Sequence, residues 1–140
     1  VTMKQRTLMI VKPDAVAGGL AGEIIARVEG AGFALRAIRM ARLTPRQAEA
    51  FYEVHRGKLF YPGLVEFMSS GPCVPMVLEK ENAVEALRAF IGATDPERAA
   101  PGTIRKDFGT DVGQNAVHAS DSPDNAQIEI AFFFDTAGSI

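Results

Sequence analysis

The stretch Asn115–Pro123, which reads NAVHASDSP, organises our interpretation of the whole chain. Its first residues predict the end of a short strand, with Val117 as the apolar strand residue. Ser122 and Pro123 predict a helix start, because serine is a preferred N-cap and proline fits the first helical turn without losing a hydrogen bond. The sequence therefore presents His118 at a strand end, directly before a turn and a helix.

The helix that begins at about Pro123 carries a carboxylate on its apolar side. Its apolar stripe consists of Ala126, Ile130, Phe133 and Phe134. Glu129 lies on the same stripe, and a buried carboxylate needs a hydrogen-bonding partner, for which His118 and Ser120 are the nearest candidates. An imidazole oriented by a glutamate is typical of a histidine that acts as nucleophile or base. A histidine beside an apolar strand is also commonly structural, so spacing alone leaves both readings open.

Thr7–Val11 is a short, continuously apolar run, which predicts a strand covered on both faces. Pro13 ends this strand, because proline cannot donate to a ladder. The preceding Lys12 is well placed to meet a phosphate, although a solvated lysine would fit the pattern equally. Gly18–Gly22 lacks the spacing of known phosphate-binding loops, so we expect a plain loop there.

The remaining segments complete the predicted order of elements. They are a helix over residues 21–28, a strand over 33–43, a helix over 44–55, a strand over 73–79 and a helix over 82–91. The 33–43 strand carries arginine at every third position, which we expect an edge position or a bulge to accommodate. Lys58–Met68 predicts a helical piece or a lid over a pocket. Thr94–Gln114 has no periodicity and predicts a long ordered loop, a type of segment that is usually functional.

Two of these helices show pairs of residues that predict their N-terminal caps. Thr44 and Gln47 form a capping-box pattern with proline between them, and Asn82 and Glu85 form a second such pair. Pro75 cannot donate to a ladder, so we expect it at the start of its strand or at a bulge.

The order of elements gives two strand–helix–strand halves in about 130 residues. It predicts an α+β fold, a ferredoxin-like sandwich in which helices cover a four-stranded antiparallel sheet. The sequence shows no internal repeat or linker, so we expect residues 1–140 to form a single domain.

Composition narrows the class of protein. Fifteen basic and 17 acidic residues give a net charge of −2, which offers no broad attraction to nucleic acid or anionic lipid. Cys73 is the single cysteine and lies in an apolar run, so we expect a buried thiol and a reducing environment. No apolar run reaches the length of a membrane span, and the N-terminus lacks a secretory pattern. We therefore expect a cytoplasmic protein without nucleic-acid or membrane partners.

Residues 115–121 read Asn-x-x-His-Ala-Ser-Asp, which resembles the active-site signature of nucleoside diphosphate kinases. The likeness runs from about Arg6 to Phe134 and includes residues 7–14, 92–96 and 102–105. The short tail after Phe134 resembles the bacterial type. The resemblance implies that the terminal phosphoryl group of a nucleoside triphosphate moves to a nucleoside diphosphate by a ping-pong mechanism through a phosphohistidine on His118. It also implies the same ferredoxin-like fold.

The resemblance assigns further residues to the phosphates. It implies that Lys12, Arg88 and Arg105 supply positive charge, while Thr94 and the hydroxyl of Tyr52 donate hydrogen bonds. Such an arrangement suits phosphoryl transfer, which depends mainly on positioning and on neutralising charge.

The resemblance also assigns residues to the rest of the nucleotide. It implies that Asn115, together with Lys12, contacts the ribose 3′-hydroxyl, and that Phe60 and Val112 hold the base between apolar faces. Stacking carries little information about base identity, so broad base specificity is expected, with ATP and GTP among the substrates.

Ser120 and Glu129 would support the catalytic histidine. The sequence holds no carboxylate cluster for a dedicated metal, so Mg²⁺ would arrive on the phosphates, with Asp121 touching it through water. Leu59 stands where many family members have proline, a departure that would loosen the predicted lid. Family members form homo-oligomers, and an edge strand at Phe33–Leu43 would suit pairing with a two-fold mate. We expect a hexamer, with a tetramer as the alternative.

Three other classes compete with this reading. A hydrolase could combine Ser120, His118 and Glu129, although the sequence lacks a G-x-S-x-G elbow. A phosphohistidine carrier would keep His118 without the nucleotide-binding residues. A noncatalytic nucleotide-binding or scaffold protein would normally have lost the histidine.

Overall fold

The computed structural model describes residues 4–134, so the short tail after Phe134 lies outside the described residues. The strands are β1 (Lys4–Val11), β2 (Ala34–Ile38), β3 (Val74–Glu81) and β4 (Val117–Ala119). The helices are α1 (Pro13–Ala17), α2 (Ala21–Gly30), α3 (Pro45–Phe51), α4 (Tyr61–Met68), α5 (Ala83–Ile91), α6 (Ile104–Phe108) and α7 (Pro123–Phe133), with a 3₁₀ turn η1 (Glu53–His55).

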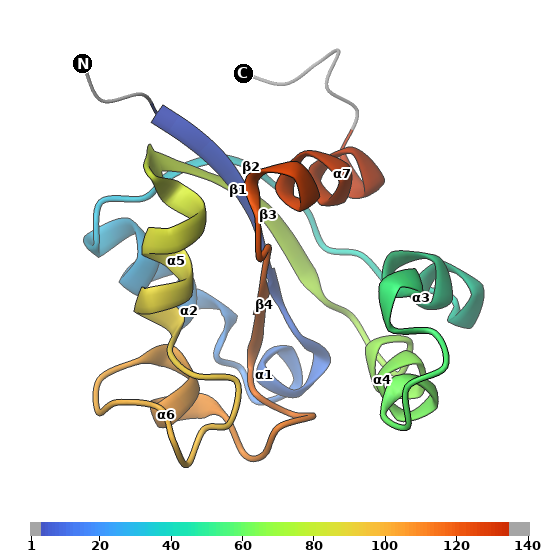
Figure 1. Cartoon of the computed structure of the whole chain (residues 1–140). Helices are drawn as coiled ribbons and strands as arrows, with labels where there is room; N and C mark the ends of the chain where they lie inside the picture. Colours follow the sequence, from blue (N-terminus) through green and yellow to red (C-terminus); the bar gives the residue numbers. More distant parts are fainter. Residues whose placement is uncertain (1–3, 135–140) are drawn as a thin grey trace.

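The four strands form one antiparallel sheet in the order β2-β3-β1-β4. This order and the alternation of strands with helices confirm the predicted ferredoxin-like α+β sandwich (Figure 1). β1 lies inside the sheet, between β3 and β4, and Ile10 of β1 is the register partner of His118 in β4. The sheet therefore brings the end of the first strand beside the histidine, although the two are far apart in sequence.

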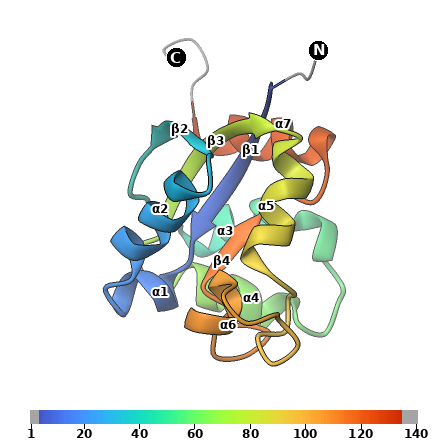
Figure 2. The ribbon, with the colours of Figure 1, turned by 90° about the vertical axis from the view of Figure 1, so that its left-hand side faces the viewer.

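Helices cover both faces of the sheet (Figures 1 and 2). On one face, α2 and α5 pack over Met9 and Val11, while on the other α3, α4 and α7 pack over Leu8 and Ile10. These four β1 side chains are fully buried. Their alternation between two cores explains why this strand is continuously apolar rather than alternating.

The segment Phe33–Leu43 is shorter as a strand than we predicted. Only Ala34–Ile38 forms β2, and a single bridge between Ala41 and Cys73 continues the pairing. β2 is an edge strand of this sheet, and its register shifts between Leu35 and Ala37, at Arg36. This bulge confirms the predicted accommodation of the arginine spacing.

Three short elements were not predicted from the sequence. The expected loop at 94–114 contains α6, which begins after an N-cap hydrogen bond from Lys106 N–H to Thr103 Oγ1. Helix α1 follows Lys12 at once, and η1 follows α3. Helices of five residues are too short to show a 3.6-residue period, which is why the pattern missed α1 and α6. Among the described residues, no helix has the length and apolar character needed to span a bilayer.

The two predicted caps have different outcomes. The capping box at Thr44 forms as expected, with reciprocal hydrogen bonds to Gln47. Asn82 precedes α5 but does not cap it, because its backbone is left-handed at φ 53° and its side-chain amide donates to the Glu85 carboxylate. Pro75 is the second residue of β3, close to the strand start as predicted, and its carbonyl accepts from Arg39 N–H.

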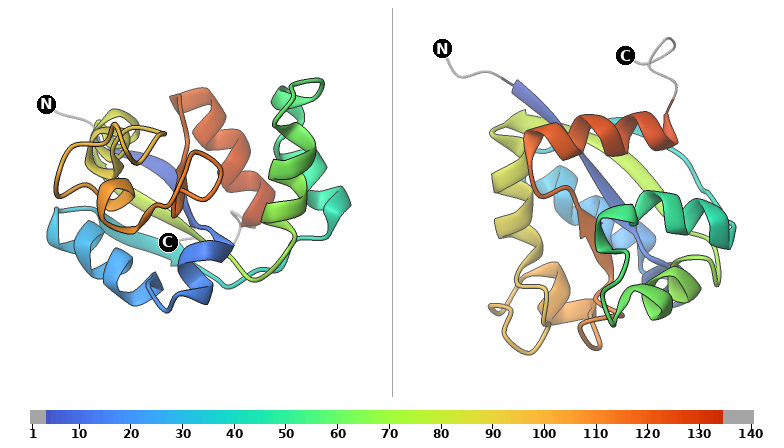
Figure 3. Two further views of the ribbon diagram at one scale, coloured as in Figure 1. Left: turned by 90° about the horizontal axis from the view of Figure 1, so that it is seen from below. Right: turned by 45° about the vertical axis from the view of Figure 1, so that its right-hand side comes forward.

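Helices α3 and α4 lie side by side and pack next to α7 (Figure 3). The ring of Phe51 in α3 lies 5.2 Å from that of Phe133 in α7, which joins α3 to a helix that itself packs on β1. Cys73 is fully buried in this layer, as predicted, and burial raises the pKa of its thiol to about 11. This layer contributes the aromatic residues that surround His118.

Candidate functional site

The centre of the candidate site is a hydrogen-bonded group at the end of β4. His118 Nε2 lies 2.8 Å from Glu129 Oε1, and Ser120 Oγ donates to the same oxygen over 2.8 Å. This confirms that Glu129 points inward to His118 and Ser120. A carboxylate accepts hydrogen bonds, so Nε2 carries the ring proton and Nδ1 keeps its lone pair. The geometry therefore leaves Nδ1 as the nucleophilic nitrogen.

The same contacts disfavour the hydrolase that the sequence left open. Ser120 donates its proton to Glu129 and not to His118, and the Ser120 side chain is fully buried. A serine nucleophile needs an accessible hydroxyl that donates to the imidazole. Ser120 instead helps to hold the carboxylate that orients the histidine.

Two aromatic rings enclose the imidazole from α3 and the residue that follows it. Phe51 and Tyr52 meet His118 edge-on, with ring centroids 5.3 and 5.8 Å away. The Tyr52 hydroxyl is buried without a hydrogen-bond partner in the described structure, and burial, with Glu129 nearby, raises the pKa of Tyr52. The hydroxyl thus keeps its proton and needs an acceptor, which a bound phosphate oxygen would supply.

Lys12 occupies a buried position beside the histidine. Its Nζ donates to Asn115 Oδ1 over 2.8 Å, and the Asn115 amide donates to the carbonyl of Thr94. Burial lowers the pKa of Lys12 to about 8, the Arg105 charge adds to this effect, and Asp14 opposes it. The structure therefore brings three of the predicted nucleotide-binding residues into one hydrogen-bonded chain.

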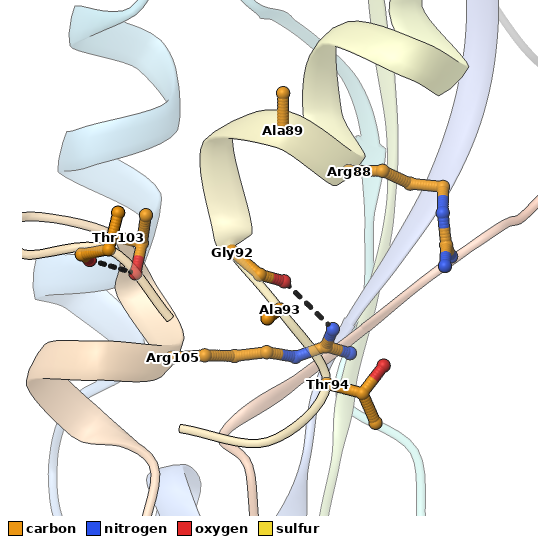
Figure 4. A pocket seen from close by; sticks show the side chains of 8 residues that line it. Arg88, Ala89, Gly92, Ala93, Thr94, Thr103 and Arg105 are labelled. Atoms are coloured by element: carbon orange, nitrogen blue, oxygen red, sulfur yellow. Dashed lines mark hydrogen bonds between the residues drawn. The ribbon is translucent and has the colours of Figure 1, made fainter. Parts of the chain in front are cut away.

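Two arginines extend this positive region (Figure 4). Arg105 is 7% exposed and donates to the carbonyls of Gly92 and Val117, while its Nε is buried without a partner. Burial, followed by the Arg88 charge, lowers the pKa of Arg105 to about 10. Arg88 donates to the carbonyl of Ala119. Among the described residues, the side-chain hydrogen bonds of both arginines go to carbonyl oxygens and not to a carboxylate, so an anion would be strongly favoured here.

A pocket of about 360 Å³ opens beside these arginines. Its lining consists of Arg88, Ala89, Gly92, Ala93, Thr94, Ala100, Thr103 and Arg105. Figure 4 shows the Arg88 and Arg105 side chains reaching into this region from α5 and α6. The pocket thus combines cations with the predicted hydroxyl donor, Thr94.

The two residues predicted to hold a base lie at the surface. Phe60 is 53% exposed, and its ring lies 5.2 Å from that of His55, which in turn stacks on Tyr52. Val112 is 56% exposed and lies on the tight turn that Asp111 holds before Asn115. Exposed apolar side chains of this kind are available to stack on a planar ring.

Asp121 is the one residue that we expected near a metal. It is exposed, and its Oδ1 accepts from the Asn125 amide over 2.6 Å. No group of three or more potential metal ligands occurs among residues 4–134. This donor set fits a metal that is held mainly by a ligand's phosphates, with Asp121 at its periphery.

Sequence reasoning missed several residues of the site. Phe51 contacts His118 and His55 contacts Phe60. In the sequence, both residues indicated only the apolar face of a helix. Ala116 has a left-handed φ of 75°, and alanine gives no sequence signal for it. Gly109 has no room for a side chain, because a Cβ there would lie 2.6 Å from the Arg105 carbonyl and 3.2 Å from Asn115 Cα. The glycine at position 109 was the one sequence signal for this close approach of the backbone.

Comparisons with known proteins point to one family. The family model described as "Nucleoside diphosphate kinase" matches residues 5–138. A nucleoside diphosphate kinase from Persephonella marina is 57% identical over 130 residues, covering 93% of each chain. A solved structure of the Aquifex aeolicus nucleoside diphosphate kinase is 50% identical, with a TM-score of 0.96 over 99% of this chain and 100% of that one. A Halobacterium salinarum nucleoside diphosphate kinase in complex with CDP is 41% identical, with a TM-score of 0.94, covering 99% and 92%.

The titration of Lys12 provides a test of this electrostatic arrangement. Its pKa is about 8 in the folded chain, against about 10.4 in an unfolded one. Between these values the unfolded chain binds one more proton, so the stability of the wild type should rise with pH relative to Lys12→Met, by roughly 3 kcal/mol. Urea unfolding of both proteins from pH 7 to 10.5 measures this difference. A stability difference that does not change with pH across this range would show that burial does not lower the pKa of Lys12.

Proposed function

Since this chain belongs to the nucleoside diphosphate kinase family, we propose that His118 is the residue on which its phosphohistidine forms. The protein is a phosphotransferase that moves the terminal phosphoryl group of a nucleoside triphosphate to a nucleoside diphosphate. Such kinases work by a ping-pong mechanism, in which the first nucleotide leaves before the second reacts. The observation that carries our assignment is the 2.8 Å contact between His118 Nε2 and Glu129.

In the first half-reaction, the Nδ1 lone pair of His118 attacks the terminal phosphorus. The bond from that phosphorus to the bridging oxygen breaks, and the nucleoside diphosphate leaves with the electron pair. The proton stays on Nε2, where the Glu129 carboxylate stabilises the positive charge that develops on the ring. In the second half-reaction, a terminal oxygen of another nucleoside diphosphate attacks the same phosphorus, and the P–N bond breaks.

We assign the phosphates to the cations that surround His118. Lys12, Arg88 and Arg105 would neutralise the charge of the moving group and of its neighbours, which is the main requirement of phosphoryl transfer. The burial of Lys12 and Arg105, which are 6% and 7% exposed, supports this assignment, and the exposed Arg88 would approach the phosphates from the solvent side. Thr94 and the unpartnered Tyr52 hydroxyl would donate hydrogen bonds to phosphate oxygens.

The remainder of the nucleotide would lie toward the surface. We propose that Asn115 and Lys12 bind the ribose 3′-hydroxyl, since their side chains already meet over 2.8 Å. Phe60 and Val112 would hold the base by stacking alone, which supports broad base specificity.

Magnesium would enter with the nucleotide. When bound with the nucleotide, the cation would help to neutralise the charge that develops on the leaving diphosphate. Asp121 has an exposed carboxylate that accepts from the Asn125 amide, and it would contact the cation through water.

We further propose that residues 1–140 form a single kinase domain, which the match of the family model to residues 5–138 supports. A cytoplasmic location would supply its nucleotide substrates and keep the single thiol, Cys73, reduced.

His118→Ala tests the assignment directly. After incubation with γ-labelled ATP and removal of nucleotide, wild-type protein should carry acid-labile label that chases into GTP, CTP and UTP on addition of the diphosphates. His118→Ala should carry no label while binding nucleotide within a few fold, because the nucleophile is lost but the cations remain. His55→Ala removes the only other histidine and should remain labelled.

Each result of this experiment has a defined meaning. Label that persists in His118→Ala would overturn the assignment. Label that chases only to another protein would indicate a carrier, and a chase that differs more than a hundredfold among diphosphates would contradict base binding by stacking.

Glu129→Gln tests the support of the imidazole. An amide cannot stabilise the ring charge as a carboxylate does, so turnover should fall by roughly 10–100-fold, the size of effect seen for residues that orient metal ligands. The exposed Glu66→Gln on α4 is the matched control and should retain full turnover. Steady-state kinetics of both variants, with nucleotide affinity measured separately, give this comparison. A Glu129→Gln variant that turned over as fast as the wild type would show that the carboxylate is merely structural.

We propose a homohexamer, with a tetramer as the alternative. The edge position of β2, together with Ile38 and Met40 at 44% and 65% exposed, supports pairing of this strand with a second chain. Light scattering on a sizing column at micromolar concentration should give a mass of six chains of 15.0 kDa, or four for the alternative. A stable particle of one chain would refute the assembly.

A further inference from the structure

A strained backbone turn at Ala116 lies directly before β4, the strand that carries His118. Ala116 has φ 75°, and Val117 N–H donates to the Asn115 carbonyl over 2.9 Å, which closes a γ-turn of the rare, strained kind. Ala116 is fully buried, so water does not offer an alternative to its hydrogen bonds. The turn joins Asn115 to the strand that presents His118, and its conformation therefore sets the relative position of both side chains.

Both backbone groups of Ala116 are held by the segment that follows β1. The Ala116 N–H donates to Asp14 Oδ2 over 3.1 Å, and its carbonyl accepts from Lys12 N–H over 2.9 Å. The other oxygen of Asp14, Oδ1, is buried without a hydrogen-bond partner in the described structure. Leaving a carboxylate oxygen buried and unpartnered is costly, which argues that Asp14 is held there for a purpose beyond filling space.

We propose that Asp14 is a positioning residue of the phosphoryl-transfer site. Its carboxylate clamps the Ala116 turn and so holds Asn115 and His118 in place against Lys12. This inference rests on the proposed function, because it takes His118 as the nucleophile. The clamp itself is a structural claim that can be measured without activity.

The Asp14 carboxylate has a second effect on the same site. Three influences act on the Lys12 ammonium: burial and the Arg105 charge lower its pKa, and the Asp14 charge raises it. Asp14 therefore keeps Lys12 protonated to higher pH than burial and Arg105 alone would allow. Asparagine at position 14 would keep an oxygen that accepts the Ala116 N–H but would remove this charge, so the two effects are separable.

Four variants test the clamp. Asp14→Ala should lower turnover by roughly 10–100-fold, the range for residues that orient a reacting group. Asp14→Ala combined with Ala116→Gly should recover at least threefold over Asp14→Ala, because glycine adopts a positive φ without support. Asp14→Asn should keep a turnover within about fivefold of wild type at pH 7. On the alkaline side of the pH profile, its kcat/KM should begin to fall at a lower pH than that of the wild type. Glu23→Gln, which removes one charge from the first turn of α2, is the control and should behave as wild type.

Amide hydrogen exchange of the nucleotide-free proteins gives a readout independent of catalysis. The Ala116 amide should exchange at least tenfold faster in Asp14→Ala than in wild type or Glu23→Gln, with the β1 and β3 amides unchanged. If the wild type formed no phosphohistidine, the proposed function would fail while the exchange result still reported on the clamp.

Two results would overturn the proposal. One is that Asp14→Ala turns over as fast as the wild type and its Ala116 amide exchanges no faster than in the wild type. The other is a loss in Asp14→Ala that neither Ala116→Gly nor the asparagine variant relieves, which would mean that Asp14 only supports the general fold.

Discussion

The hydrogen bond between His118 Nε2 and Glu129 Oε1 is the interaction on which the site depends. It fixes which nitrogen carries the proton, and it forms only because α7 lies against the sheet with Glu129 on its inner side. Ser120 shares the same oxygen, so the imidazole, the carboxylate and the hydroxyl form one unit. Phe51 and Tyr52 then close the ring off from solvent on the side of α3.

The cations around this unit lie in an environment that disfavours their charge. Lys12 and Arg105 are buried near each other, and burial lowers the pKa of both because their charges are separated from water. Buried positive charge is unfavourable, and the Asp14 carboxylate offsets only part of it at Lys12, so a polyphosphate would relieve the rest by supplying further negative charge. The protein thus keeps a locally unfavourable arrangement in the free state, which is expected of a site that binds its ligand through charge.

The sheet order explains how residues from distant segments reach one place. β1 lies between β3 and β4, so Lys12, the residue that follows β1, meets the segment before β4. The close approach at Gly109 brings the end of α6, the helix that carries Arg105, against Asn115. Connections outside the sheet therefore supply most of the charged groups, while the strands supply a rigid frame.

The sequence by itself determined the ferredoxin-like order of elements, the buried strand before Lys12, the helix start at Ser122 and the inward side of Glu129. Each follows from local rules of periodicity, capping or turn chemistry that act within a few residues. Only the tertiary structure decided the left-handed Ala116, its contact with Asp14 and the pairing of Lys12 with Asn115. These depend on contacts more than 100 positions apart, which no local pattern encodes.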